Sequence, residues 1–408
     1  MKKMFGLPQT VFTLGLVSLL TDLSSEMIYP ILPLFLANVI GVSTTFIGLV
    51  EGIAESTASL LKIFSGWLSD KLGKRKQLIL AGYGFSSITK PFMALATAGW
   101  HVLGLRFLDR LGKGVRGAPR DAMIADVTDP GERGKAFGFH RAMDTMGAII
   151  GPAAAFIILS FTNDGYRPLF LIATIPAMIA VGIIVTGVRD EVKFAGSSPS
   201  PLPSPIKGEG VRNGTLRQIP RNFVFLLIII GIFTLGNSSD AFLILRAQGI
   251  GVDVKLIPIL WLFFNLIYTL VSMPAGSLSD RIGRRRVILI GFAVYSLCYA
   301  GFAFASKAWH AWLLFGIYGI YYGMTEGVIR AYIADIIPRD IRATSYGIYN
   351  FVVGVLLLPA NLLTGFIWKT LGPTAAFGFG ATLALAATAG FACLKFAKME
   401  CKSQLVLK

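Results

Sequence analysis

Long apolar runs alternate with short polar segments along the whole chain. Runs such as Phe223–Leu235, Val287–Ala305 and Ala375–Leu394 are apolar enough to span a bilayer or to form most of a span, which takes roughly 20 helical residues. Because lipid offers no hydrogen bonds to the backbone, such segments must be helical. The pattern predicts twelve membrane-spanning helices, at roughly Val11–Asn38, Phe46–Ser69, Gln77–Ala98, His101–Asp126, Ala136–Ser160, Pro168–Val188, Asn222–Arg246, Leu256–Ser279, Val287–Phe304, Ala311–Asp335, Ser345–Lys369 and Thr374–Phe396.

One motif occurs twice, about half a chain apart. Gly66-x3-Asp70-x2-Gly73-x-Arg75 recurs as Gly276-x3-Asp280-x2-Gly283-x-Arg285, each time between two apolar segments. Further matches follow at nearly constant spacing: Asp126 with Asp335, Arg133 with Arg342, and Gly138 with Gly347. The repeat indicates two related six-helix bundles, with an axis along the membrane normal.

The predicted organisation is therefore an all-α polytopic membrane protein with two pseudo-symmetric bundles. Residues 1–190 form the first bundle and residues 222–408 the second. Residues 191–221 form a flexible cytoplasmic linker, because they are rich in Ser, Pro and Gly and have no hydrophobic period.

Composition and charge support a membrane location. Of the 408 residues 54% are hydrophobic and 15% charged, whereas about a quarter of a soluble chain is charged. The formal net charge is +16, and the Lys and Arg residues gather in loops on one side of the predicted membrane. The opposite loops, such as Ile40–Thr45, carry no charge. By the positive-inside rule both termini are cytoplasmic, in a bacterial inner membrane. The same distribution argues against nucleic acid as a partner.

These motifs resemble those of the major facilitator superfamily, over essentially the whole chain. The loop motif matches the family pattern twice. Arg110 and Gly114 match a second motif, on the fourth helix, in which Lys113 replaces the family's Gln. A third motif, on the fifth helix and associated with antiporters, is matched by Gly147, Gly151 and Pro152. Ala155 stands where the family often has Gly. The resemblance implies a twelve-helix transporter whose first, fourth, seventh and tenth helices line a central cavity.

The repeated loops are candidate gates. Asp70 and Asp280 end their helices before a Gly turn, where a carboxylate can accept from N–H groups at a neighbouring helix N-terminus. By pseudo-symmetry Asp70 faces the start of the eleventh helix, and Asp280 the start of the fifth. The alternative is a charged loop that only fixes topology. The gating set is Gly66, Asp70, Gly73, Arg75, Gly276, Asp280, Gly283 and Arg285, with Arg133 and Arg342 as secondary contacts.

The fifth helix carries a predicted bend. Gly147 and Gly151 permit close helix approach, and Pro152 disturbs the hydrogen-bond ladder. His140 and Asp144 lie four residues apart on the same helix, where His140 has either a packing role at the bundle interface or a titrating one.

Asp22 and Glu26 are the first candidates for proton coupling. They lie four residues apart, hence on one face of the first helix. A carboxylate in the membrane costs about 3 kcal/mol and usually faces a cavity or a partner. Such a group can exchange protons near neutral pH. The alternative is a static partner for a nearby arginine. The resemblance adds Arg110, which matches the motif arginine linked with coupling.

The fourth helix carries an unusual charged stripe. Asp109, Lys113, Arg116 and Arg120 recur at helical spacing, and Arg106 lies nearby. Because lipid would not tolerate the stripe, it lines either a substrate cavity or an ion-pair network. A cavity would suit an anionic or zwitterionic group. The network would involve Asp22, Glu26, Asp109 and Asp144. Across the cavity we expect Asp240, Tyr322, Glu326 and Arg330, of which the last two could pair.

The sequence therefore predicts a secondary transporter that works by alternating access. No nucleotide-binding motif appears, so the expected energy source is an ion gradient, most readily protons. The favoured activity is export of a small organic molecule, and uptake or exchange of a polar or anionic metabolite is the alternative. We expect no enzyme activity, no cofactor and no metal, since the three histidines are dispersed. The expected partners are substrate, coupling ion and lipid, with the monomer as functional unit.

Overall fold

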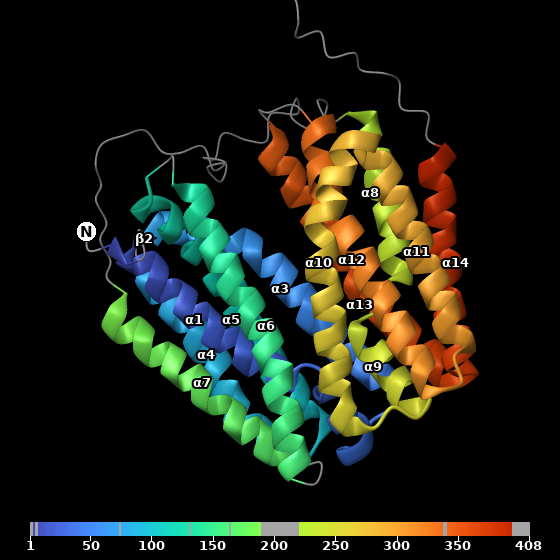
Figure 1. Cartoon of the computed structure of the whole chain (residues 1–408), viewed down its shortest axis with the longest axis horizontal. Helices are drawn as coiled ribbons and strands as arrows, with labels where there is room; N and C mark the ends of the chain where they lie inside the picture. The colour runs from blue at the N-terminus through green and yellow to red at the C-terminus, as the bar shows by residue number, and fades with distance from the viewer. Residues whose placement is uncertain are drawn as a thin grey trace, which may run out of the picture.

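The computed structural model describes residues 3–4, 7–72, 75–129, 132–162, 165–188, 220–337 and 341–393. Apart from a short hairpin that pairs Lys3 with Pro8, the described elements are helices (Figure 1). Their bounds are β1 Lys3–Met4, β2 Leu7–Pro8, α1 Gln9–Ile28, α2 Leu32–Leu34, the π-helix η1 Phe35–Val39, α3 Thr44–Leu72, α4 Arg75–Leu95, α5 Gly99–Val127, α6 Arg133–Phe161, α7 Tyr166–Gly187, α8 Arg221–Gly236, α9 Asp240–Gly249, the 3-10 helix η3 Val254–Leu256, α10 Ile257–Ile282, α11 Arg284–Phe304, α12 Ala308–Ile336, α13 Arg342–Leu371 and α14 Pro373–Cys393.

Every predicted span coincides with one long helix or with consecutive helical elements. Among the described residues, nine helical segments are long and apolar enough to cross a membrane. The helices α3, α5 and α12 are not among them, although each has 29 residues. These are the helices on which the sequence places many of its membrane-depth charges. Hydropathy alone therefore misses the membrane helices that carry many of the charged side chains.

Two predicted spans are not continuous helices, which corrects the sequence analysis. The first breaks after α1, because Pro30 has no N–H to continue the ladder, and resumes as α2 and η1. The seventh breaks between α8 and α9. There the Ser239 hydroxyl accepts from Ala241 N–H at 3.3 Å and caps α9, while Ser239 N–H donates to Asn361 at 2.7 Å. The second break places Asp240 at the first position of α9.

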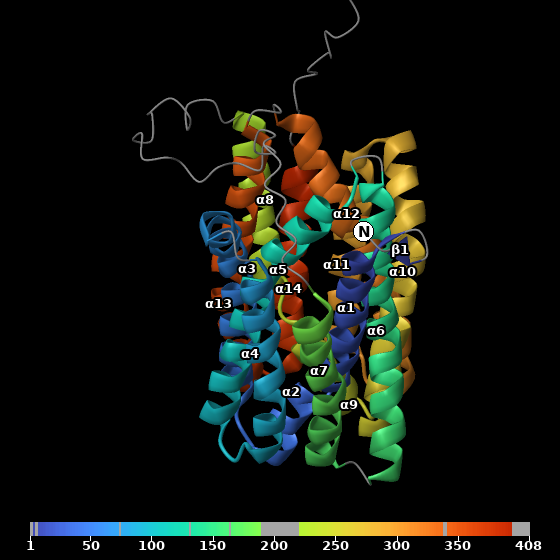
Figure 2. The same ribbon diagram turned by 90° about the vertical axis from the view of Figure 1, so that its left-hand side faces the viewer.

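The helices form two groups, which approach each other mainly through α3 with α13 and through α6 with α10. In Figure 1 the groups lie close together at the lower end and diverge toward the upper end, where α3 ends and α4 begins. We call the upper end the motif end, because both loop motifs lie there, and the lower end the closed end. Figure 2 shows α1 packed between α6 and α7 within the first group.

At the closed end α3 and α13 meet backbone to backbone. The hydroxyls of Thr44 and Thr45 donate to Gly365 O at 3.0 and 3.2 Å. A Cβ on Gly48 would lie 2.2 Å from Asn361 O, and a Cβ on Gly365 would lie 2.5 Å from Thr44 O. Glycine at both positions is what permits this contact between the two groups.

Candidate functional site

A cavity of about 190 Å³ lies where α1, α3, α5, α9 and α10 meet. We call it the central cavity. Its lining consists of Asp22, Ser25, Glu26, Tyr29, Glu55, Arg106, Asp109, Arg110, Lys113, Arg116, Asp240 and Trp261. The structure thus brings together with Asp240 both predicted residues of the first helix and all those of the fourth except Arg120. Four other predicted residues lie elsewhere: Arg120, Tyr322, Glu326 and Arg330.

Two carboxylates of α3 neutralise two arginines of α5. Arg106 donates from Nε and Nη2 to Glu51 at 3.3 and 3.1 Å, and both side chains are buried. Arg106 Nη1 also lies 3.7 Å from Asp109 Oδ2. One turn further, Arg110 Nη2 lies 3.1 Å from Glu55 Oε1. This side of the stripe is an ion-pair network, but Glu51 and Glu55 supply most of its acids, rather than the predicted Asp22, Glu26 and Asp144.

The remaining basic groups of the stripe are less fully paired. Among the described residues, the Lys113 ammonium has no hydrogen-bond or ion-pair partner, and its side chain is exposed to the cavity. Arg116 lies over the Tyr83 ring at 4.2 Å, and its buried Nη1 has no hydrogen-bond partner. The buried Nε of Arg110 is also unpartnered. All three residues line the central cavity from α5.

Acidic and aromatic groups form the other walls. Trp261 Nε1 donates to Glu26 Oε2 at 2.8 Å, and the Trp261 and Tyr29 rings lie 5.2 Å apart. Asp240 accepts from Tyr318 at 2.6 Å and from Tyr29 at 3.5 Å. Asp22 has no hydrogen-bond or ion-pair partner within the described chain. The cavity therefore presents carboxylate oxygens that are free to accept.

Arg120 and Asp144 form a separate polar cluster beside α1. Arg120 Nη2 pairs with Asp121 at 3.0 Å, and its Nη1 lies 3.5 Å from the Ser18 hydroxyl. That hydroxyl donates to Asp144, whose Oδ2 lies 3.6 Å from His140 Nδ1. His140 is thus buried in contact with Asp144, at the surface where α6 packs on α1.

The fifth-helix glycines press directly on α1. A Cβ on Gly147 would lie 2.6 Å from Leu19 O and 2.9 Å from Asp22 Cβ. A Cβ on Gly151 would lie 2.6 Å from Leu23 O and 2.9 Å from Glu26 Cβ. The two glycines therefore set the helix spacing at the two candidate coupling residues. Pro152 follows within the same helix.

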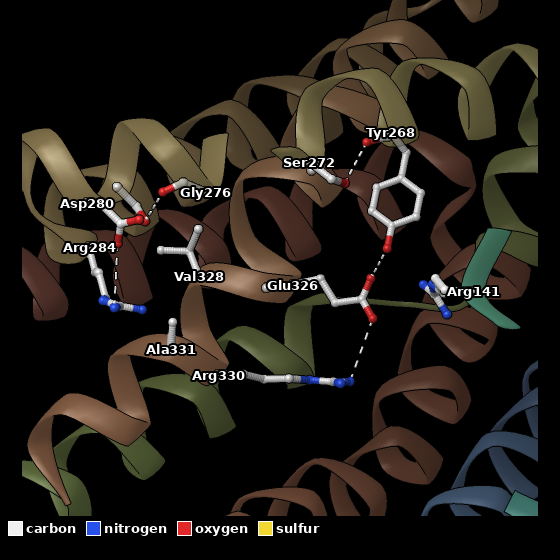
Figure 3. Close-up of a pocket in the computed structure, with 13 residues that line it drawn as sticks. Arg141, Tyr268, Ser272, Gly276, Asp280, Arg284, Glu326, Val328, Arg330 and Ala331 are labelled. Atoms are coloured by element: carbon white, nitrogen blue, oxygen red, sulfur yellow. Dashed lines mark hydrogen bonds and ion pairs between the residues drawn. The ribbon is translucent and has the colours of Figure 1, made fainter. Parts of the chain in front are cut away.

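A second, larger pocket of about 480 Å³ opens near the motif end, between α6, α10 and α12 (Figure 3). It contains Glu326 and Arg330, which pair at 3.6 Å. Tyr268 donates to Glu326, and Arg141 points toward both from α6. The expected Glu326–Arg330 pair is present. It lies in this pocket rather than across the central cavity from α5, which corrects the predicted placement.

Tyr322 is likewise absent from the described lining of the central cavity. It packs in an aromatic cluster, with ring centroids 5.1 Å from Tyr318 and 5.5 Å from Phe264. Tyr318 in turn holds Asp240. Tyr322 therefore packs against Tyr318, the residue that holds Asp240 in the cavity wall.

The described residues of the loop motifs tie neighbouring helices together within each bundle. Arg75 pairs with Asp126, and Arg284 Nε pairs with Asp335 at 2.6 Å. Arg285 donates to the last carbonyls of α14, at Phe391 and Ala392. The pairs of Arg75 with Asp126 and of Arg284 with Asp335 are equivalent, although the motif aligns Arg75 with Arg285.

The structure describes some residues of the predicted gate and not others. Asp280 lies 3.6 Å from Arg284, and with Gly276 it lines the larger pocket. Gly283 has a φ of 94°, which favours glycine at this turn. Gly73 and the side-chain positions of Gly66, Asp70, Arg133 and Arg342 lie outside the described residues, and the predicted gating role stays a prediction.

Comparison with known proteins identifies the chain. The family model described as Major Facilitator Superfamily matches residues 14–358 and, in a second match, residues 241–403. The chain belongs to the major facilitator superfamily. An MFS-type transporter of Methanocaldococcus jannaschii, itself uncharacterised, is 38% identical over 386 residues, which is 93% of each chain. The class B tetracycline resistance protein of Escherichia coli is 24% identical over 304 residues, which is 72% of each chain.

Solved structures show the same fold. The nucleoside transporter NupG aligns with 95% of this chain and 100% of its own, with a TM-score of 0.76 and 15% identity. The predicted twelve-helix fold of the major facilitator superfamily is confirmed. The chain is a secondary transporter and an integral membrane protein, not an enzyme.

Several residues in or beside the central cavity of this superfamily member escaped the sequence analysis. Glu51 and Glu55 are charges at membrane depth for which the sequence analysis gives no role. Their spacing of four residues matches the spacing of Arg106 and Arg110, which was a usable signal. Tyr29 and Trp261 gave no signal, since aromatic residues are common throughout the spans.

Proposed function

We propose that this transporter exports a small organic molecule from the cytoplasm in exchange for protons. The observation that carries the proposal is the contact of Gly147 and Gly151 with α1 at Asp22 and Glu26. Any movement of α6 against α1 changes the surroundings of both carboxylates. A protonation change at either one is thereby linked to helix packing, which is what coupling requires.

The orientation follows from the distribution of positive charge. The motif end carries the Lys- and Arg-rich loops, so it is the cytoplasmic end of a protein in the cytoplasmic membrane, with both termini inside. The conformation described here is then closed outward by the contacts of Thr44, Thr45 and Gly48 with α13. It diverges toward the cytoplasm, where an exporter loads its cargo.

Alternating access requires that the closed end open while the motif end closes. The α3–α13 contact is the one to break. At the motif end, Arg141 of α6 and Glu326 of α12 face each other across the larger pocket (Figure 3). Their approach, together with the loop motifs, is the proposed inner closure.

A relative named for resistance to tetracycline supports a small organic cargo. Uptake or exchange of a polar or anionic metabolite is the second candidate. The crowded basic face of α5 favours it, because Lys113 has no partner in the part of the chain that the structure describes. Direction of transport separates the two.

The test uses everted membrane vesicles from cells that express the wild type or Asp22→Asn. Respiration acidifies the vesicle lumen, and a pH-sensitive dye reports proton release when fractions of a small-molecule extract are added. Export predicts that one fraction releases lumenal protons and that its compound accumulates inside wild-type vesicles only. Asp22→Asn is expected to lower the proton release at least tenfold.

The control separates coupling from loss of protein. Asp121→Asn removes a carboxylate that pairs with Arg120 outside the central cavity, and it should retain most of the proton release. Accumulation in right-side-out but not in everted vesicles would replace export by uptake. Equal proton release by wild type and Asp22→Asn would remove Asp22 as a coupling residue.

A further inference from the structure

Ion pairing divides the basic stripe of α5 into a satisfied part and a free part. Arg106 is occupied by Glu51 and Asp109. Among the described residues, the free part consists of Lys113, Arg116 Nη1 and Arg110 Nε, although Arg110 Nη2 pairs with Glu55. Arg110 and Arg116 are 7% and 5% exposed, so these unpartnered N–H groups are buried ones. Both residues nevertheless line the central cavity beside the Lys113 ammonium, so this part of the stripe brings positive charge to the cavity that the described side chains do not fully pair.

The three donors repeat every three residues and therefore share one face of α5. Together they bring an ammonium and two guanidinium groups to the cavity wall. A carboxylate, phosphonate or phosphate is the group that such donors bind best.

The opposite wall of the cavity is acidic rather than basic. Glu26 has only one of its oxygens in the bond to Trp261, and Asp22 has no partner in the described chain. The Tyr29 and Trp261 rings stand beside them, 5.2 Å apart. Carboxylates beside aromatic faces are suited to a protonated amine. The cavity thus has a wall for an anion and a separate wall for a cation.

Charge balance and size restrict the ligand further. Among the described lining residues, five carboxylates face four basic groups, so the cavity does not call for a ligand with a large net charge. The volume of about 190 Å³ lies below the about 300–1,000 Å³ typical of pockets for drug-sized ligands. Bulky hydrophobic compounds do not fit this description.

We propose that the central cavity binds a small zwitterion, with its acidic group on Lys113, Arg110 and Arg116 and its amine on Glu26 and Asp22. The inference rests on the proposed transport function and names the class of its substrate. A zwitterion satisfies both walls and leaves the net charge of the cavity unchanged. Protonation of Asp22 or Glu26 would weaken the hold on the amine, which links release to the coupling ion.

The test measures binding to the purified full-length protein in nanodiscs. The probes are α-, β- and γ-amino acids and aminoalkylphosphonates, each compared with its N-acetyl derivative and with its methyl ester, which for the phosphonates is the dimethyl ester. Calorimetry and thermal shift report the dissociation constants. A zwitterion is expected to bind, and both derivatives are expected to bind at least tenfold more weakly. Two outcomes would show that the zwitterion proposal is wrong. One is that no probe binds. The other is that, for each zwitterion that binds, its N-acetyl derivative or its methyl ester binds as tightly as the zwitterion itself.

Variants assign the two walls. Lys113→Gln is expected to weaken zwitterion binding at least tenfold, Lys113→Arg to restore most of it, and Lys307→Gln, outside the cavity, to leave it unchanged. Glu26→Gln should weaken binding of the zwitterion but not of its N-acetyl derivative. Unchanged binding in Lys113→Gln overturns the assignment. Proton release in the vesicle assay is independent of these probes, so proton-coupled transport of another compound class would reject the zwitterion and leave the proposed function standing.

Discussion

Glu51 and Arg106 are buried charges in a chain that spans a membrane, and each depends on the other. Glu51 is 1% exposed and accepts two hydrogen bonds from the Arg106 guanidinium. A buried pair of this kind adds little net stability, because desolvation offsets the attraction. Removing one partner is different, since it leaves an uncompensated charge. At the scale of single residues, stability therefore rests on complete pairs.

The first prediction concerns these pairs. Glu51→Gln should destabilise the protein by about 3 kcal/mol, because the Arg106 guanidinium would lose its nearer carboxylate and keep an ion pair only with Asp109, at the longer distance. Glu55→Gln is the matched change, and it should cost clearly less, because Glu55 is 34% exposed at its side chain. Melting of the two purified variants in the same detergent measures the difference. Equal melting temperatures would contradict the argument.

Helix α6 illustrates what a whole element contributes. Its glycines at 147 and 151 meet backbone atoms of α1, whereas a Cβ at Gly138 of the same helix would meet no atom within 4 Å. At positions 147 and 151 α6 is thus packed closely against α1, whereas at position 138 there is room for a larger side chain. Movement of α6 relative to α1 at this contact therefore changes the surroundings of Asp22 and Glu26 together.

The second prediction follows from this contact. Gly151→Ala would place a methyl group 2.6 Å from Leu23 O, so α6 and α1 must separate. Overpacking of this kind costs roughly 1–3 kcal/mol, and we expect the transport rate to fall at least tenfold. Gly138→Ala should leave both the melting temperature and the rate near the wild-type values. Vesicle transport and thermal melting test both variants, and a fully active Gly151→Ala would show that close approach is not needed.

For the whole molecule, the α3–α13 contact holds one end shut. It consists of hydroxyl donors to Gly365 O and of glycines without room for a side chain. The two bundles diverge from there toward the motif end (Figure 1). A protein that alternates between two openings must break this contact in each cycle, so the contact sets the balance between the two states.

The third prediction is a shift of that balance. Gly48→Val should hold α3 away from Asn361 and favour the state that is open at the present closed end. A cysteine at Ser25, in the central cavity, reports the shift when the three native cysteines are replaced by serine. A membrane-impermeant maleimide should label it from the motif end in the parent protein and from the opposite end in Gly48→Val.

The control for this experiment is Gly104→Val, at a position where a Cβ meets no atom within 4 Å. Its labelling should match the parent. If Gly48→Val is instead labelled in the same pattern as the parent protein, the α3–α13 contact does not set the conformational balance.

The sequence by itself determined the twelve spans, the duplicated halves and the presence of charges at membrane depth. Each of these is local, because the cost of placing a residue in lipid depends on that residue and its near neighbours. Helical spacing also showed that Asp22 and Glu26 share a face, as do Lys113 and Arg116.

Only the tertiary structure decided what those faces meet. The pairing of Glu51 with Arg106, the place of Glu326 in the larger pocket and the helix break before Asp240 depend on how each helix is rotated and packed. That rotation is fixed by contacts between segments far apart in the chain, such as Asn361 with Ser239. Hydropathy reports the free energy of entering lipid, and it carries no information on the angle at which one helix faces another.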